Sequence, residues 1–237
     1  MGTRKRWFLL LGASLVCLAG ARAQEADFIP LFDGKTFSGW EGSRTVFRIE
    51  EGALVGGTLA AGIANNEFLC TTQSFDDFEL RLQAKIVGPG DNGGIQFRTR
   101  RVPDHYEVSG YQADVGSVSA AWFARVVGKG SAGEIAPDAK RSVWGALYDE
   151  SRRNRYLAWP PREAVDAVLK PKDWNTLTVR AEGPRIQIWL NEVQTVDFTE
   201  TDHIPGSGAV CLQIHSGAPG EVWHRALSLR AIETDAR

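Results

Sequence analysis

The sequence predicts an all-β protein in which two antiparallel sheets pack face to face. In many short segments, apolar and polar residues alternate with the period of a strand, and dense turn clusters separate these segments. No segment of ordinary helix length shows the helical repeat of about 3.6 residues. The 25 glycines among 237 residues suit the many tight turns of such a fold.

The clearest strand pattern covers 78–86, where apolar residues alternate with charged and amide side chains. A turn cluster at 89–94 follows, and 95–100 has the pattern of the next strand, so the two segments predict a hairpin. Segments 175–181, 185–190 and 193–198 predict a three-strand meander, because short turns separate them. Further strands are predicted at 47–50, 53–55, 68–71, 111–115, 144–148, 209–215 and 221–232, and a short helical turn at 161–169.

Residues 1–23 have the composition of a secretory signal peptide. Three basic residues precede an almost uncharged apolar run over 7–20, and the small-x-small pattern Ala21-Arg22-Ala23 ends it. This predicts cleavage near Ala23 and export to the periplasm or the cell exterior. The apolar run is too short for a permanent membrane span, and no other segment is long and uncharged enough. We expect residues 24–237 to form a single domain, since all-β sandwiches often reach about 200 to 250 residues.

The charge balance argues against two classes of partner. The predicted signal peptide contains four basic residues and no acidic one, so the mature chain carries 23 basic against 29 acidic residues, a formal charge of −6. This charge disfavours binding to nucleic acid or to an anionic membrane.

Two cysteines remain after the predicted cleavage, Cys70 and Cys211. They could pair in an oxidising compartment, or remain two small buried thiols, and the sequence leaves both possibilities open. No Cys/His cluster has the spacing of a zinc site.

Strand parity places planar polar side chains on common faces. In the segments 95–98, 111–115 and 211–215, the residues that share a face are Gln96 with Arg98, Gln112 with Asp114, and Gln213 with His215. If the three strands lie in one sheet, these faces merge into a patch of amide, carboxylate, guanidinium and imidazole groups that suits sugar hydroxyls. The alternative is the ordinary solvated face of an antiparallel sheet, although such faces favour Lys, Glu and Thr.

The segment 144–153 is the second candidate for ligand contact. Trp144 and Tyr148 share a strand face and offer aromatic surface for a pyranose ring, and the acidic and basic residues that follow include Glu150 and Arg152. A core tryptophan followed by a charged, solvated loop explains the same pattern, so both interpretations stay open. The sequence contains neither GxSxG nor HExxH, so a serine hydrolase or a zinc protease lacks its motif.

Six ordered motifs resemble those of the 3-keto-disaccharide hydrolase-like domain family. They are Leu31-Phe32-Asp33-Gly34-Lys35 with Ser38-Gly39-Trp40, Asn92-Gly93-Gly94-Ile95-Gln96-Phe97-Arg98, Gly110-Tyr111-Gln112-Ala113-Asp114, Asp173-Trp174-Asn175, Ile188-Trp189-Leu190-Asn191 and Leu212-Gln213-Ile214-His215. The resemblance implies a concanavalin-like lectin/glucanase jelly roll, a carbohydrate partner such as a keto-disaccharide or glycan, and cleavage of 3-keto-glycosides. One departure is Asn191-Glu192, where the family commonly has Asn-Gly.

Cleavage of a 3-keto-glycoside starts with removal of the proton on C2, which the neighbouring ketone acidifies. The base needs a pKa near neutrality, which favours His215 at about 6.5 over Asp114 at about 3.9 unless burial raises the carboxyl pKa. We therefore expect Asp114 and His215 to transfer protons, and Gln96, Arg98 and Gln112 to hold the enolate. A bound divalent cation could replace or assist these groups.

Two alternatives remain at the level of the sequence. Asp114 and Glu150 could act as the carboxylate pair of an ordinary glycoside hydrolase. The chain could also be a non-catalytic carbohydrate-binding module, with Trp144, Tyr148 and Tyr111 as platforms. Whichever class holds, Gln213 and Arg152 are expected among the residues that bind the sugar.

Overall fold

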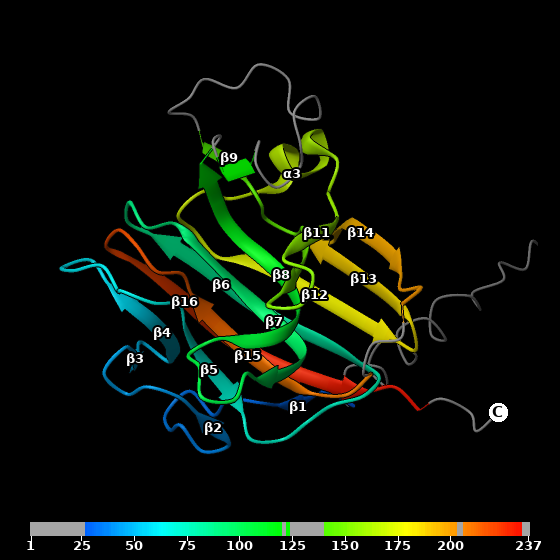
Figure 1. The fold of residues 1–237 in the computed structure, drawn as a ribbon, viewed down its shortest axis with the longest axis horizontal. Helices are drawn as coiled ribbons and strands as arrows, with labels where there is room; N and C mark the ends of the chain where they lie inside the picture. Colours follow the sequence, from blue (N-terminus) through cyan, green and yellow to red (C-terminus); the bar gives the residue numbers. More distant parts are fainter. Residues whose placement is uncertain (1–26, 120–121, 124–139, 203–205, 234–237) are drawn as a thin grey trace, which may run out of the picture.

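The computed structural model describes residues 27–119, 122–123, 140–202 and 206–233, so the predicted signal peptide lies outside the described residues. Two antiparallel sheets make up the fold (Figure 1). Sheet A has the order β14 (Val193–Thr199), β13 (Arg185–Leu190), β12 (Asn175–Glu182), β6 (Phe78–Val87), β16 (Gly220–Ala231), β4 (Ala53–Thr58) and β3 (Phe47–Glu50), with β1 (Ile29–Pro30) paired to β16. Sheet B has the order β11 (Arg155–Ala158), β10 (Leu147–Glu150), β8 (Val108–Ser119), β7 (Asn92–Arg101), β15 (Ala209–Ile214), β5 (Glu67–Thr71) and β2 (Trp40–Glu41), with β9 (Lys140–Ser142) paired to β8.

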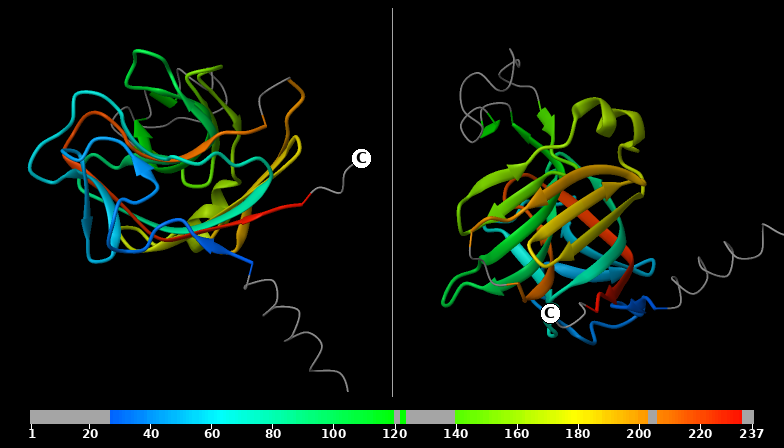
Figure 2. Two further views of the ribbon diagram at one scale, coloured as in Figure 1. Left: turned by 90° about the horizontal axis from the view of Figure 1, so that it is seen from below. Right: turned by 90° about the vertical axis from the view of Figure 1, so that its right-hand side faces the viewer.

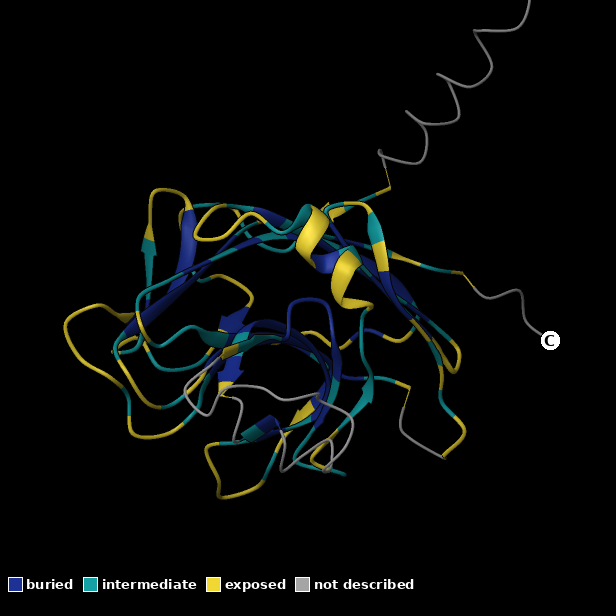
Figure 3. Cartoon of the chain, turned by 90° about the horizontal axis from the view of Figure 1, so that it is seen from above, coloured by how far each residue is buried: buried dark blue, intermediate teal, exposed yellow. Residues whose placement is uncertain are grey.

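The two sheets form the layers of a sandwich, which Figure 2 shows edge-on in its left view. Alternate residues of each strand enter the shared core, as Leu80 and Leu82 do from β6 and Ile95 does from β7, all at most 1 % exposed. Helix α3 (Arg162–Val168) lies at the periphery and buries only Val165, in agreement with its mostly exposed residues in Figure 3. The predicted all-β class with two packed antiparallel sheets is confirmed.

The predicted hairpin between 78–86 and 95–100 is wrong. The two segments form β6 and β7, but β6 pairs with β12 and β16 in sheet A, whereas β7 pairs with β8 and β15 in sheet B. The turn between them crosses from one sheet to the other and packs on the β15–β16 connection, where a Cβ on Gly90 would lie 2.0 Å from the Ala218 carbonyl oxygen. Turn residues mark where a strand ends, but they do not determine which sheet the next strand joins.

The predicted meander is confirmed, because β12, β13 and β14 are consecutive neighbours in sheet A. The two residues between β13 and β14, Asn191 and Glu192, both have positive φ, 46° and 73°. This is the backbone of a type I′ hairpin turn, in which Gly is favoured at the second position.

Glu192→Gly is therefore expected to stabilise the protein by about 0.5 to 1 kcal/mol, because a side chain in the left-handed region costs on the order of 1 kcal/mol. Urea denaturation near pH 7 measures the difference. Glu192→Ala is the matched control, since it removes the same carboxylate and keeps a Cβ, and it should give no such gain. A Gly variant no more stable than the Ala variant would contradict the assignment of strain to this turn.

Cys70 and Cys211 form a disulfide between β5 and β15, where they are directly opposite each other in the register. Both are buried, at 2 % and 0 % exposed. The structure thus selects the first of the two possibilities that the sequence left open. In the part of the chain that the structure describes, no helix is long and apolar enough to cross a membrane.

Candidate functional site

One face of sheet B packs on sheet A, and the opposite face carries planar polar side chains. Ile95, Ala113 and Leu212 belong to the core, so Gln96, Gln112 and Gln213, their neighbours in the strands, point the other way. Gln96 and Gln112 are register partners on β7 and β8, and Gly94 is the partner of both Asp114 and Gln213. The structure therefore brings four of the predicted site residues, Gln96, Gln112, Asp114 and Gln213, to one face.

A cavity of about 480 Å³ is lined by residues of this face and of the loops beside it. Asp114, Gln112 and Glu150 supply polar groups to its lining, and three aromatic side chains, Trp122, Tyr148 and Tyr156, contribute as well. Asp91, Lys140 and His215 add charged or titratable groups to the lining. This volume falls in the range of small-molecule sites.

The Asp114 carboxyl group is almost completely enclosed, at 3 % exposed. The Tyr156 hydroxyl donates to Oδ2 over 2.6 Å, and the Gln112 amide Nε2 donates to Oδ1. Burial raises the pKa of Asp114 to about 7, although both hydrogen bonds oppose the rise. The sequence favoured His215 as the base unless burial raised the pKa of Asp114. Burial does raise it, so Asp114 has the near-neutral pKa that a base requires.

The Glu150 carboxyl group lies in the same cavity, at the end of β10. The Gln213 amide donates to its Oε2 over 3.3 Å. Burial raises the pKa of Glu150 to about 8, and the negative charges of Glu107 and Asp114 add to the rise. Near neutral pH, Glu150 is therefore mostly protonated and Asp114 is partly ionised.

An aromatic cluster of Tyr148, Tyr156 and Trp122 borders the cavity. Tyr148 and Tyr156 are register partners on β10 and β11, with ring centroids 4.9 Å apart, and the Trp122 ring lies 6.2 Å and 5.9 Å from them. Burial raises the pKa of both phenols, so both stay protonated and are able to donate a hydrogen bond, as the Tyr156 hydroxyl does to Asp114. Aromatic faces beside hydroxyl donors suit a sugar ring.

His215 lines the cavity, but unlike Gln213 it does not belong to the buried part of the polar face. It follows the last residue of β15, is exposed, and its Nδ1 lies 2.8 Å from the Ser216 carbonyl oxygen. The backbone N–H of His215 donates to the Asn92 carbonyl, which fixes this end of the strand beside β7.

Arg98 does not join the polar face, and the parity prediction for it is wrong. A register shift lies between Phe97 and Arg100, and Arg98 adopts a φ of 49° there. Its guanidinium instead pairs with Asp77 at 2.6 Å and donates to two backbone carbonyls, those of Asp76 and Gly183.

Trp144 and Tyr111 are core residues, at 5 % and 2 % exposed. Trp144 precedes β10 and is separated from it by Gly145 and Ala146, and Gly145 has a φ of 74°, so the single strand face expected for Trp144 and Tyr148 does not form. Tyr111 shares the strand face of Ala113 and stacks on Phe97 with centroids 5.6 Å apart. Neither residue lines the cavity, so the structure does not place them where a ligand platform was expected.

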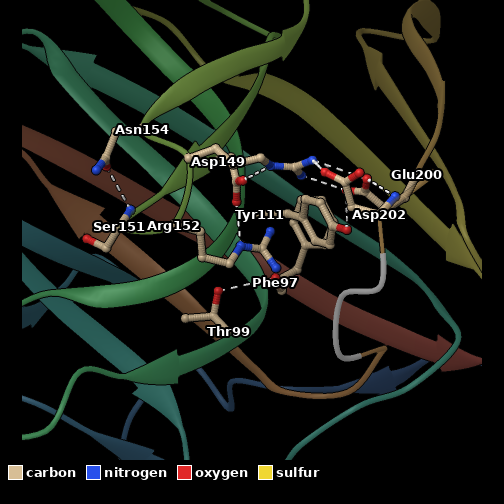
Figure 4. A network of polar contacts seen from close by, with 10 residues as sticks. Phe97, Thr99, Tyr111, Asp149, Ser151, Arg152, Asn154, Glu200 and Asp202 are labelled. Carbon is tan, nitrogen blue, oxygen red and sulfur yellow. Dashed lines mark hydrogen bonds and ion pairs between the residues drawn. The ribbon is translucent and has the colours of Figure 1, made fainter.

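Arg152 belongs to a partly buried ion-pair network around Asp149 of β10 (Figure 4). Asp149, which is completely buried, accepts from the Nε atoms of Arg152 and Arg153. Arg153 also pairs with Glu200 at 2.6 Å, and the Tyr111 hydroxyl donates to Glu200 over 2.8 Å. The network ties the β10–β11 hairpin, which carries Tyr148, Tyr156 and Glu150, to the segment that follows β14.

Asp149→Asn is expected to cost about 1.5 to 3 kcal/mol, because two charge-assisted hydrogen bonds lose their anion in a buried setting. Chemical denaturation near pH 7 measures the loss. Asp166→Asn is the matched control, since Asp166 makes an exposed ion pair with Arg162 and should change stability by at most about 0.5 kcal/mol. Equal effects of the two substitutions would show that the network contributes little.

Several cavity residues escaped the sequence reasoning. Tyr156 and Trp122 had no motif, and Lys140 and Asn66 stood in segments without clear periodicity. The turn signal at 151–154 between two aromatic positions could have identified Tyr156, because a hairpin there makes Tyr156 the partner of Tyr148. Within the described ranges, no group of three or more His, Cys, Asp or Glu side chains is arranged to hold a metal ion.

A family model described as the 3-keto-alpha-glucoside-1,2-lyase-like domain matches residues 27–230. Among solved structures, the chain is similar to a "putative glycosyl hydrolase" from Parabacteroides distasonis, with 17 % identity, 90 % of this chain and 97 % of that chain covered, and a TM-score of 0.63. It is also similar to the exoplasmic/lumenal domain of VIP36 in its Ca²⁺/Man₃GlcNAc-bound form, with 11 % identity, coverages of 89 % and 90 %, and a TM-score of 0.58.

A third similar structure is a Bacillus subtilis protein of unknown function with a galectin-like fold, with 9 % identity, coverages of 86 % and 94 %, and a TM-score of 0.56. These likenesses agree with the concanavalin-like jelly roll that the sequence motifs implied, and that prediction is confirmed. A search of curated proteins finds no match.

Proposed function

The chain belongs to the 3-keto-alpha-glucoside-1,2-lyase-like domain family, and from this premise we propose that it is an exported enzyme that cleaves 3-keto-glycosides by removing the proton beside the keto group. The observation that carries the proposal is a pair of carboxyl groups in one cavity, the buried Asp114 and the partly buried Glu150, with pKa values of about 7 and about 8. Groups that exchange protons near neutral pH are what an acid–base elimination requires.

In the proposed reaction, ionised Asp114 takes the proton from C2 of the 3-keto sugar. The C–H electron pair moves into the C2–C3 bond, and the negative charge collects on the keto oxygen as an enolate. When the enolate collapses, a C1–C2 double bond forms and the C1–O bond breaks. Protonated Glu150 gives its proton to the departing oxygen, and addition of water to the double bond completes a hydrolysis.

The remaining cavity groups suit binding and charge stabilisation. The aromatic cluster offers rings for stacking on the sugar, and the Tyr148 hydroxyl is a protonated donor that can face the enolate oxygen. His215 and Lys140 lie along the lining, where they can contact the leaving group or the sugar hydroxyls. Arg98, which pairs with Asp77, takes no part in this proposal.

Separate observations support a carbohydrate partner and a location outside the cytoplasm. The similar structures include one named a "putative glycosyl hydrolase" and one that holds Man₃GlcNAc. The Cys70–Cys211 disulfide suits an oxidising compartment, as does the signal-peptide pattern at residues 1–23.

The ordinary two-carboxylate glycosidase fits the same cavity less well. In that mechanism one carboxyl group is protonated, and its partner is ionised to stabilise an oxocarbenium-like transition state. Here burial raises the pKa of both groups, so neither is firmly ionised at neutral pH. A base matched to neutral pH is better suited to removing a carbon-bound proton.

The direct test is to incubate the purified protein with native disaccharides and with their 3-keto derivatives, with and without a chelator. We expect release of the leaving sugar from the keto substrates alone, because only the ketone acidifies C2. Cleavage of native disaccharides would favour the two-carboxylate glycosidase. Binding without any product from either set would favour a carbohydrate-binding module. Loss of activity with chelator, restored by added metal, would add a divalent cation to the mechanism.

A further inference from the structure

A line of three buried side chains runs across sheet B to Asp114. Gln96 on β7 donates its amide Nε2 to Gln112 Oε1 on β8, and Gln112 Nε2 donates to Asp114 Oδ1. The three side chains are 0 %, 4 % and 3 % exposed. Gln112 and Asp114 line the cavity, but Gln96 lies beneath it.

The direction of each hydrogen bond in this line is fixed by the charge at its end. An ionised carboxylate only accepts, so Gln112 must turn its NH₂ group toward Asp114. Its carbonyl oxygen then faces Gln96, which must turn its own NH₂ group toward Gln112. The Gln96 Oε1 at the far end is buried and has no hydrogen-bond partner among the described residues. If Asp114 carried a proton and donated it to Gln112, both amides would be favoured in the reverse orientation.

The backbone beside this line leaves space for it. Gly94 is the register partner of Asp114, and a Cβ there would lie 2.4 Å from Gln112 Cδ and 2.8 Å from Gln112 Nε2. The φ of Gly94 lies outside the left-handed region, so the strand itself does not require glycine at this position. The space above Gly94 is occupied by the Gln112 amide.

We propose that Gln96 is a positioning residue, which orients the Gln112 amide so that its NH₂ group faces Asp114 and keeps that carboxyl group ready to accept a proton. This role deepens the proposed function and rests on it. Gln96 touches neither the cavity nor Asp114 and acts only through Gln112. Its effect should therefore appear in the protonation equilibrium of Asp114.

Other groups near Asp114 also influence its titration. The titratable and charged groups around it are Tyr156 on β11, Tyr148 and Glu150 on β10, and Asp91, Lys140 and His215 elsewhere in the cavity lining. Substitution of Gln96 leaves all of these in place. Gln213 offers a matched comparison, because it is an equally buried amide on the same face. Its Nε2 donates to Glu150, whereas that of Gln96 donates to Gln112.

The test is the pH profile of kcat/KM for a 3-keto-disaccharide with Gln96→Leu, Gln96→Glu and Gln213→Leu. Without the Gln96 donor, Gln112 can reverse and accept from protonated Asp114, so the acidic limb of the profile should move upward by about one pH unit in Gln96→Leu, a loss of about tenfold on that limb. The maximal rate should stay within about threefold. Gln96→Glu should behave like the wild type where its carboxyl group is protonated and can donate, and lose activity as that group ionises.

Gln213→Leu should leave the acidic limb unchanged and move the alkaline limb, which Glu150 controls. Uniform loss of activity at every pH in Gln96→Leu, with no movement of the limb, would overturn the proposal and indicate a merely structural role. Gly94→Ala, whose added Cβ pushes on the Gln112 side chain, should move the acidic limb in the same direction. Thermal melts monitor the folding of all variants.

A second readout needs no turnover. Carboxyl ¹³C NMR of protein labelled at Asp, with Asp114→Asn to assign the signal, gives the Asp114 titration in the wild type and in Gln96→Leu. A higher Asp114 titration midpoint in Gln96→Leu supports the positioning role of Gln96 even if no keto-sugar is cleaved. In that case only the proposed function fails. An unchanged Asp114 titration in Gln96→Leu overturns the positioning role of Gln96, whatever the activity.

Discussion

Asp114→Asn is expected to lower kcat on a 3-keto-disaccharide by about a thousandfold, with little change in binding. The amide has nearly the same shape and can still accept from Tyr156, but it cannot take the proton from C2. General base catalysis contributes typically about 10²- to 10⁴-fold, and the loss of this group removes most of it. Steady-state kinetics gives kcat, and calorimetric titration with the product sugar gives the affinity.

The matched control for this variant is Asp197→Asn. Asp197 is an exposed carboxylate on β14 of sheet A that pairs with Arg185, so its replacement changes the same chemical group far from the cavity. It should leave kcat unchanged. If Asp114→Asn kept turnover within about tenfold of the wild type, Asp114 would hold a hydroxyl and the base would have to be sought elsewhere. His215→Asn is the variant to examine next, because His215 lines the same cavity.

Local alternation was sufficient to predict most of the strands and the packing of two sheets. The strands β6, β12, β13 and β16 begin and end within about two residues of the segments that their patterns indicated, because a strand with one buried face alternates along its whole length. Alternation could not predict that β6 and β7 belong to different sheets. A crossing between sheets and a hairpin turn use the same turn residues, and the contacts that distinguish them, such as Gly90 against Ala218, are distant in the sequence.

The same reasoning explains which residues of the polar face of sheet B could be predicted. Gln96, Gln112, Asp114 and Gln213 lie on regular parts of β7, β8 and β15, so parity placed them together. Parity failed at Arg98 and Trp144, where backbone with positive φ at Arg98 and Gly145 interrupts the alternation. Burial was a further unknown, because a single sequence does not show how deep a polar side chain lies. The choice between Asp114 and His215 as the base depended on that depth.

The second large effect concerns stability, because Glu150→Gln is expected to stabilise the protein in alkaline solution. Burial and nearby negative charges raise the pKa of Glu150 from 4.5 to about 8. Between these two values the unfolded chain is ionised at this residue and the folded protein stays protonated. The folded state therefore binds more protons, and its stability falls as the pH rises through this window. A glutamine cannot ionise, so the variant escapes the fall.

The stability difference between Glu150→Gln and the wild type should be small near pH 4.5 and should grow to about 5 kcal/mol above pH 8. Urea denaturation at a series of pH values measures it, and taking the difference between the proteins removes the contribution of other groups. One of these is His224, a buried histidine whose pKa is lowered to about 3 by burial. As the pH falls below 6.5, the unfolded chain takes up a proton at His224 that the folded protein does not, so the fold loses stability. A difference that did not change with pH would show that Glu150 is ionised in the folded protein.

The same variant separates a functional role from a structural one. If Glu150 donates the proton to the departing oxygen, Glu150→Gln should gain stability above pH 8 and lose about a hundredfold or more in kcat. A residue retained for folding would show the opposite pattern, with stability lost and turnover of the remaining folded protein preserved. A carboxyl group that lowers the stability of the fold at neutral pH is expected at a position where its protonation serves the reaction, because it contributes nothing to stability there.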